Sequence, residues 1–170
     1  MGQTIISAGL VVIVTIAVIN ANRLIINSET TKLEGQARLQ AADIAMEVLT
    51  EARLRKFDEY ADTVYYQGTG EFTSYSSLGP ESGESVSLPD VYPYQSRQRY
   101  DDMDDFNNYR RTVNTISIVG YVVTCKVYYS SQTYPDTPKT SKTYVKTMEV
   151  NVSHPLYLVT PIRLSMTRTY

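Results

Sequence analysis

The chain has 170 residues, enough for one modest domain and an accessory element. Its 16 Lys and Arg side chains against 18 Asp and Glu give a formal charge of −2, so no basic surface supports binding to nucleic acid. A single cysteine, Cys125, excludes an internal disulfide but not an extracytoplasmic location. All 15 tyrosines lie at or after residue 60 and all 7 prolines at or after residue 80, so an aliphatic first part precedes a Tyr-, Thr- and Ser-rich second part.

The N-terminal segment is strongly apolar. No charged side chain occurs from Gly2 to Asn22, and the first cation is Arg23. Such an uncharged run of about twenty residues is long enough to cross the roughly 30 Å hydrocarbon core of a membrane as a helix. A cleavable secretory signal has a basic start and a shorter apolar core, so we expect this segment to remain in the working protein.

The following segment predicts that the helix continues. Apolar side chains recur there at spacings of three and four, which indicates one apolar stripe. The stripe comprises Leu33, Ala37, Ala41, Ile44, Ala45, Val48, Leu49 and Ala52. On the opposite face Glu51 precedes Arg55 by four residues, an order that favours an ion pair within the helix. We therefore predict one helix over roughly residues 4–56.

The rest of the chain predicts loops followed by strands. Residues 63–112 are rich in Gly, Ser and Pro, which is typical of loops. Beyond them, the segments VNTISIVGYVVTCKVYY, TYVKTMEVNVS and PIRLSMTRTY alternate apolar and polar side chains, as strands do. The predicted apolar faces comprise Tyr121, Val123, Cys125 and Val127, then Tyr144, Met148, Val150 and Val152, then Ile162, Leu164 and Met166. The last strand is expected to carry Arg163, Ser165 and Arg168 on its polar face.

Short consecutive strands joined by turns predict an antiparallel meander, and the striped helix is the obvious element to cover its apolar face. The predicted fold class is therefore α+β, with a long N-terminal α-helix packed on a C-terminal antiparallel β-sheet. We expect three parts. Residues 1–28 form an apolar transmembrane or filament-core helix, residues 29–60 its amphipathic continuation, and residues 61–170 a β-rich globular head.

This architecture, together with the first residues, resembles the type IV pilin family, which includes the pseudopilins of type II secretion. The family's N-terminal motif is Gly, a hydrophobic residue, Thr, two aliphatic residues and Glu, and this chain reads Gly2-Gln3-Thr4-Ile5-Ile6-Ser7. Ser7 stands where the family has its glutamate, so the usual pairing of that carboxylate with a neighbour's N-terminal amine cannot occur. The basic leader is also missing. Either a leader before Met1 has been removed, or the subunit is not processed in the usual way.

The resemblance implies a structural subunit of an extracellular helical filament, whose apolar helices leave the membrane and pack in a central bundle. Its partners would be many copies of itself, and the inner membrane before assembly; its final location would be the cell surface. The residues expected to form the filament core are Ile5, Ile6, Gly9, Leu10, Val11, Ile13, Val14, Ile16, Ala17 and Ile19. Two alternatives stay open: a single-pass membrane-anchored extracytoplasmic binding module, and a secretion-system pseudopilin.

Catalytic chemistry has little support, and we expect no enzyme activity. One His and one Cys leave no residues for a His-ligated metal cluster or for most nucleophile–base arrangements. Cys125 is expected to be a buried structural thiol in a strand. His154, which precedes Pro155, is expected to be a structural or surface residue at a strand end.

One polar cluster, YDDMDDFNNYRR, concentrates oxygen ligands of the kind that Ca²⁺ prefers. The candidate Ca²⁺ ligands are Asp101, Asp102, Asp104 and Asp105; no other cofactor is expected. The cluster lacks the Gly and the distal Glu of an EF-hand loop. The alternative is a turn whose aspartates cap backbone amides and face Arg110 and Arg111. Separately, Asn151-Val152-Ser153 matches the N-glycosylation sequon, so Asn151 is a candidate glycosylation site.

Overall fold

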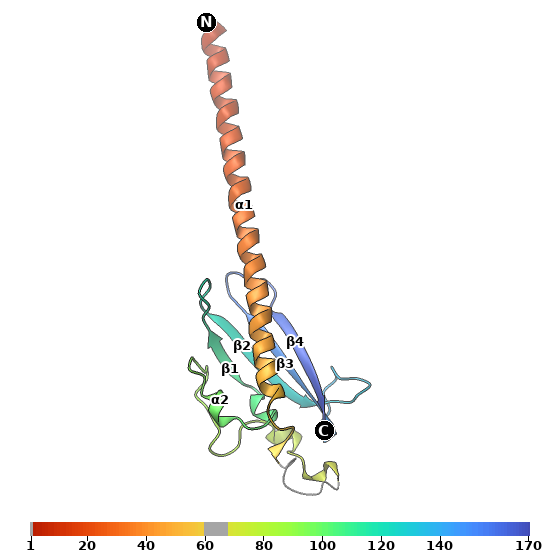
Figure 1. Cartoon of the computed structure of the whole chain (residues 1–170). Coiled ribbons are helices and arrows are strands. Elements are labelled where there is room, and N and C mark those ends of the chain that lie inside the picture. The colour runs from red at the N-terminus through yellow and green to blue at the C-terminus, as the bar shows by residue number, and fades with distance from the viewer. Residues whose placement is uncertain (1, 60–67) are drawn as a thin grey trace. The chain divides into compact units, whose positions relative to one another are not determined.

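The computed structural model describes residues 2–59 and 68–170, and of residues 2 and 4–7 it describes the backbone alone. The first element is the helix α1 (Gly2–Arg53), which confirms the predicted single N-terminal helix (Figure 1). The chain forms two compact units, residues 1–37 and residues 38–170, whose boundary lies within α1. The boundary that we expected after residue 60 lies outside the described residues.

The part of α1 in the second unit packs on the sheet through the predicted stripe. Ala37, at the unit boundary, is fully buried, and Leu33, one turn earlier, is exposed. The other stripe residues, all buried, are Ala41, Ile44, Ala45, Val48, Leu49 and Ala52. Small side chains alternate with larger ones along this face, and Ile44, Val48 and Leu49 are the large side chains that it buries.

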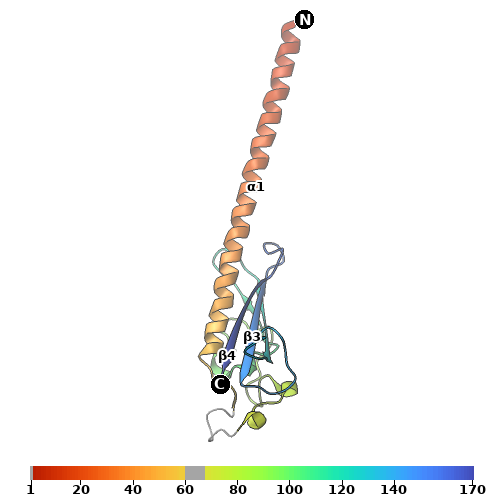
Figure 2. The ribbon, with the colours of Figure 1, turned by 90° about the vertical axis from the view of Figure 1, so that its right-hand side faces the viewer.

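The sheet has four antiparallel strands in chain order, as the predicted meander requires (Figure 1). The strands are β1 (Arg110–Val113), β2 (Tyr121–Tyr129), β3 (Val145–Ser153) and β4 (Ile162–Thr169). In the register Cys125 pairs with Val150, and Val150 pairs with Leu164, so the predicted apolar residues lie opposite one another. The predicted α+β fold class is therefore confirmed. Figure 2 shows the second half of α1 lying along one face of β3 and β4.

Three details of the strand prediction are wrong. β1 falls in residues 63–112, which we expected to be loops; it has only four residues, too few to show an alternating pattern. Tyr144 precedes β3 and is 47% exposed, so the strand begins two residues later than the expected segment, which starts at residue 143. Arg168 lies on the same face of β4 as Ile162, because six residues separate them and strand faces repeat every two. Its Nη1 donates to the carbonyl oxygen of Arg55, just after α1 ends.

The described part of the segment between α1 and β1 contains four short helical turns. These are η2 (Thr69–Glu71), η3 (Tyr75–Ser77), α2 (Ser96–Arg99) and η4 (Asp104–Phe106). A hydrophobic cluster joins this segment to the sheet and comprises Phe57, Phe72, Leu78 and Tyr129. The rings of Phe57 and Phe72 lie 5.1 Å apart, and both meet the ring of Tyr170 at the chain end. Aromatic packing therefore closes the core beyond the last turn of α1.

Candidate functional site

The first unit presents a continuous apolar surface. Eleven large aliphatic side chains in residues 10–26 are between 48% and 71% exposed. They are Leu10, Val11, Val12, Ile13, Val14, Ile16, Val18, Ile19, Leu24, Ile25 and Ile26. Monomeric soluble proteins rarely expose an apolar surface of this extent. By length and composition the helix over Ala8–Arg53 contains an apolar window that is long enough to cross a membrane.

One polar side chain of this apolar surface, that of Thr15, bonds within its own helix. The hydroxyl of Thr15 donates to the carbonyl oxygen of Val11 at 2.8 Å, so this polar side chain adds no unpaired donor to an apolar environment. A side chain added at Gly9 would meet open space in the single chain. The predicted core residues from Leu10 to Ile19 all lie on this surface, and Gly9 and Ala17 provide its small positions. The side chains of Ile5 and Ile6 lie outside the described residues.

A buried arginine links the sheet to α1. The guanidinium of Arg111 on β1 is fully buried, and its Nη1 donates to Oε2 of Glu51 at 3.3 Å. The guanidinium also lies 4.4 Å from the ring centre of Tyr94 and 3.7 Å from Glu47. The sequence analysis predicted the wrong partner for Glu51 and the wrong partner for Arg111. Glu51 faces Arg111 and Arg97 and not Arg55, and Arg111 faces the helix and not the aspartate turn.

The aspartate cluster forms a capped turn, as one of the two alternatives predicted. Oδ1 of Asp102 accepts the backbone N–H groups of residues 104 and 105 at 2.8 and 3.2 Å. Oδ2 of Asp105 accepts the backbone N–H groups of residues 101 and 102 at 2.9 and 3.1 Å. Burial, together with the nearby Asp104 carboxyl, raises the pKa of Asp102 to about 10. Asp102 therefore carries a proton at neutral pH.

The remaining two aspartates pair with lysines. Asp101 is half-exposed and forms an ion pair with Lys56, with Nζ and Oδ2 3.0 Å apart. Asp104 is fully buried and contacts Lys146 of β3. The expectation that the turn faces Arg110 and Arg111 is therefore wrong, because the neighbouring cations are lysines from other segments. The spacing of the aspartates does not indicate these partners.

The structure brings a different set of carboxylates together. Oxygen atoms of Glu81, Glu84 and Asp105 all lie within 4.8 Å of one another. Burial raises the pKa of Glu81 to about 8, with further contributions from a hydrogen bond to Glu84 and from the Asp105 and Asp104 carboxylates. Burial also raises the pKa of Asp105 to about 7. Of the four candidate Ca²⁺ ligands, only Asp105 belongs to this set within the described residues, and Ca²⁺ binding stays a prediction.

Lys146 is the second buried cation that sequence reasoning missed. It is fully buried, and its Nζ donates to Oδ2 of Asp58 and to the carbonyl oxygen of Phe57, each at 2.8 Å. It also donates to Oδ1 of Asp104. Asp58 and Asp104 are fully buried as well. Lys146 lies on the same side of β3 as Met148, Val150 and Val152, because successive side chains of a strand point to opposite faces. The alternation alone therefore places a lysine on the apolar face.

Cys125 and His154 have the structural roles that we expected. Cys125 is buried on β2, and burial raises the pKa of its thiol to about 12, so the thiol stays protonated. His154 follows β3; its Nδ1 accepts the backbone N–H groups of Leu156 and Tyr157 at 3.2 Å. Its Nε2 lies 3.1 Å from the carbonyl oxygen of Val119. Both ring nitrogens are therefore used to hold the turn after β3.

Asn151 lies inside β3 and is half-buried, paired with Thr124 on one side and Arg163 on the other. N-glycosylation acceptors usually lie in surface loops, so the folded strand is an unusual context for the modification. Glycosylation at Asn151 stays a prediction.

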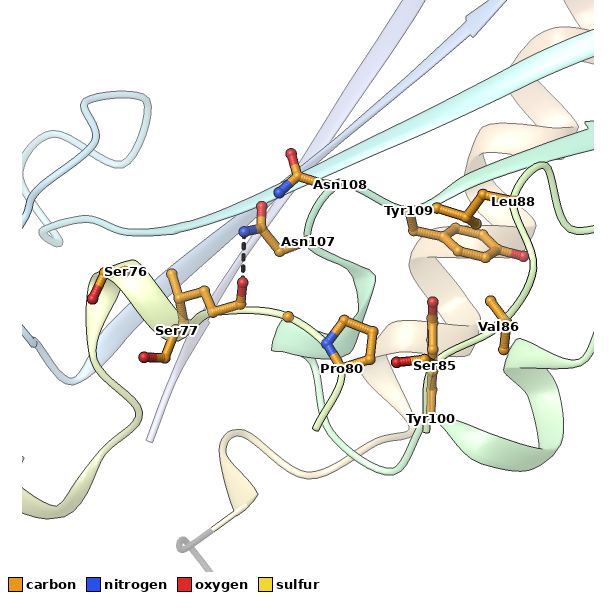
Figure 3. Close-up of a pocket in the computed structure, with 12 residues that line it drawn as sticks. Ser76, Ser77, Pro80, Ser85, Val86, Leu88, Tyr100, Asn107, Asn108 and Tyr109 are labelled. Atoms are coloured by element: carbon orange, nitrogen blue, oxygen red, sulfur yellow. Dashed lines mark hydrogen bonds between the residues drawn. The ribbon is translucent and has the colours of Figure 1, made fainter. Parts of the chain in front are cut away.

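Figure 3 shows a surface pocket between three loop segments of the second unit. Within the lining, Nδ2 of Asn107 donates to the carbonyl oxygen of Leu78 at 2.9 Å. Its lining comprises Ser76, Ser77, Leu78, Gly79, Pro80, Ser85, Val86, Leu88, Tyr100, Asn107, Asn108 and Tyr109. The lining carries serine and tyrosine hydroxyls, and none of these described residues is a His, Cys, Lys, Arg, Asp or Glu that could activate such a hydroxyl from within the lining.

Comparisons of the chain with protein-family models, with curated proteins and with solved structures yield no match.

Proposed function

We propose that the protein is a structural subunit of an extracellular helical filament, pilin-like, and not an enzyme. The observation that carries this proposal is the exposed apolar surface on residues 10–26 of α1. Burying one large aliphatic side chain is worth about 1.5–3 kcal/mol relative to leaving it in water. Eleven such side chains on one helix therefore supply a strong driving force to enter an apolar environment, either a bilayer or a bundle of like helices.

Two environments would cover this surface in succession. The chain first resides in the inner membrane, where the helix is covered by lipid. On assembly, the apolar segments leave the bilayer and pack against one another, while the sheet units lie on the outside of the filament and reach the cell surface. Gly9 and Ala17 support close helix approach, because small residues let helix backbones come near each other. Hydroxyls such as that of Thr15 need no partner from a neighbouring chain, which is compatible with either environment.

The second candidate is a single-pass membrane-anchored module that never polymerises. The same observation supports it, since the apolar run is long enough to span a bilayer. A secretion-system pseudopilin would differ from the leading proposal mainly in filament length. The second unit has its own core and a sheet of four strands, so either candidate presents a folded head outside the membrane.

Removal of the apolar segment distinguishes these proposals. We expect residues 28–170 to be a soluble monomer by sedimentation, and the full chain to form long polymers once detergent is removed. A fragment that still polymerised would show that the apolar helix is not the driving surface. A full chain that entered vesicles as a monomer and formed no polymer, in lipid or without it, would favour the membrane-anchored module.

A further inference from the structure

Three side chains from distant parts of the sequence meet in the core below the last turn of α1. Lys146 is the second residue of β3, Asp58 follows α1, and Asp104 is the first residue of η4. Each is fully buried. The Lys146 Nζ lies 2.8 Å from Oδ2 of Asp58 and also contacts Oδ1 of Asp104. A nitrogen that contacts a carboxyl oxygen lies about 3.5 Å from the carboxyl carbon, which is close to a near-attack separation.

The surroundings of Lys146 exclude water. Its Nζ lies 4.9 Å from the ring centre of Phe57 and 5.5 Å from that of Tyr129, and both rings are buried. Holding an ammonium and a carboxylate in such an environment costs several kcal/mol per ion before their attraction is counted. Condensing the two groups into an amide removes both charges and releases one water. The apolar site therefore favours the amide more than water does.

The two aspartates have different surroundings, which assigns them different roles. Asp58 accepts the backbone N–H of Thr73 at 3.0 Å on Oδ2 and 3.3 Å on Oδ1. The hydroxyl of Tyr129 lies 3.4 Å from Oδ2 and donates to the carbonyl oxygen of Thr73 at 2.7 Å. The N–H of Thr73 holds the Asp58 carboxyl in place beside Lys146. Asp104 contacts Lys146 through Oδ1, whereas its Oδ2 is buried and has no hydrogen-bond partner among the described residues. Burial raises the pKa of Asp104, against the lowering effect of Lys146, so its acid form is more populated than that of an exposed aspartate.

We propose that Lys146 and Asp104 condense spontaneously to an intramolecular isopeptide bond, with Asp58 as the proton carrier. Asp58 takes one proton from the Lys146 ammonium, and the freed amine attacks Cγ of the Asp104 carboxylic acid. Asp58 then gives this proton to the departing hydroxyl, which leaves as water, and takes the second proton from the new amide nitrogen. The C–N bond forms, the C–O bond breaks, and Asp58 ends as the acid. No oxidant, cofactor or second protein is required.

The chain contains a matched control pair. Lys56 and Asp101 also lie 3.0 Å apart from Nζ to Oδ2, but their side chains are 34% and 42% exposed. Water solvates both ions there, so the charged pair is retained and no amide forms. The proposal therefore predicts one bond, at the buried pair, and none at the exposed pair.

Mass spectrometry of the full chain in detergent tests the bond directly. We expect the wild-type chain to weigh about 18 Da less than its sequence requires, which is the mass of one water. The Lys146→Arg variant is the reference and should have the mass that its own sequence requires. Processing of the N-terminus would alter both masses equally. Lys56→Arg should retain the loss. A wild-type chain without the loss after prolonged incubation overturns the proposal, and so does a loss that persists in Lys146→Arg.

Trypsin digestion locates the bond. Acylated Lys146 resists cleavage, so the digest should contain residues 100–110 joined to residues 143–163, with fragmentation placing the link on Asp104. A link from residues 143–163 to residues 57–97 would place the bond on Asp58 and overturn the assigned roles. In Asp58→Asn, helical and sheet content by circular dichroism should match the wild type while the joined peptide is lost. A folded Asp58→Asn chain that forms the bond at the wild-type rate would contradict the proton-carrier role. This proposal does not depend on filament assembly.

Discussion

Arg111 on β1 and Glu51 on α1 form a buried ion pair, with Nη1 and Oε2 3.3 Å apart, although 60 residues separate them in the sequence. The guanidinium is fully buried, and the Glu51 side chain is only 11% exposed. The pair therefore fixes the rotation of the second half of α1 about its own axis relative to the sheet. Turning the helix would withdraw the carboxylate and leave a buried cation with fewer partners.

Removing the carboxylate should destabilise the second unit strongly. Glu51→Ala leaves the Arg111 charge buried with only the more distant Glu47 nearby, and we expect a loss of about 3 kcal/mol in the free energy of unfolding. The double change Glu51→Leu with Arg111→Met should cost less than Glu51→Ala alone, because no charge is then left buried. Denaturant unfolding of the full chain measures both. Glu34→Ala, on the first unit, is the control, and an equal loss in that variant would contradict the role of the pair.

The thiol of Cys125 should be unreactive until the sheet opens. Its pKa is raised to about 12 by burial, so the thiolate that reacts with alkylating reagents is nearly absent at pH 8. We expect the labelling rate to follow global unfolding across a denaturant series. Rapid labelling of the native chain, at a rate independent of denaturant, would show that β2 opens locally.

The acidic pair Glu81 and Asp105 should make the fold less stable as pH rises. The pKa of Glu81 is about 8 in the folded chain and 4.5 in the unfolded chain, so between these values the folded state binds more protons. Stability is therefore fully present below pH 4.5 and is lost as pH rises toward 8. Glu81 is half-exposed, and with solvent screening we expect a loss of about 1 kcal/mol between pH 5 and 8.

The Glu81→Gln variant is the comparison for this pH dependence. Its free energy of unfolding should fall less than that of the wild type between pH 5 and 8, as measured by denaturant titration. Equal slopes in the two chains would show that Glu81 titrates normally. Calcium ions added at pH 8 should restore stability only in the wild type if the carboxylates of Glu81, Glu84 and Asp105 bind them.

Much of the fold is predictable because its main elements obey simple periodicities. The stripe of α1 and the alternation of β2 depend only on local spacing, and both are confirmed. The alternation of β3 also places Lys146 on the apolar face, but the partners of the buried cations are not predictable in the same way. Arg111 and Lys146 lie 60 and 88 residues from Glu51 and Asp58. Their burial depends on partners that only the folded chain brings together.

The aspartate turn shows the same limit at shorter range. Local capping by Asp102 and Asp105 follows from side chains that bond to backbone two to four residues away, and such bonds are expected of aspartates in turns. The partners of Asp101 and Asp104 come from Lys56 and Lys146, which the spacing of the aspartates does not indicate. The set formed by Glu81, Glu84 and Asp105 likewise joins residues more than twenty positions apart.

Assembly should depend on small and apolar positions of the first unit more than on Ser7. A Ser7 hydroxyl can bond back to its own helix, so Ser7→Ala should assemble nearly normally. The side chain added in Gly9→Leu meets open space in the single chain, so this variant should insert into membranes normally. The larger side chain should block close packing of neighbouring helices. Ile13→Asp should prevent filaments, because an unpaired carboxylate in an apolar bundle is costly. Loss of assembly in Ser7→Ala alone would mean that a polar contact there sets the register.

Electron microscopy of material sheared from cells that produce the full chain tests the central proposal most directly. We expect uniform helical filaments that contain this chain, and none from cells that produce Ile13→Asp at the same level in the membrane. Wild-type chains that stay in the membrane fraction, with no filaments at the surface, would contradict the account and identify the protein as a membrane-anchored module.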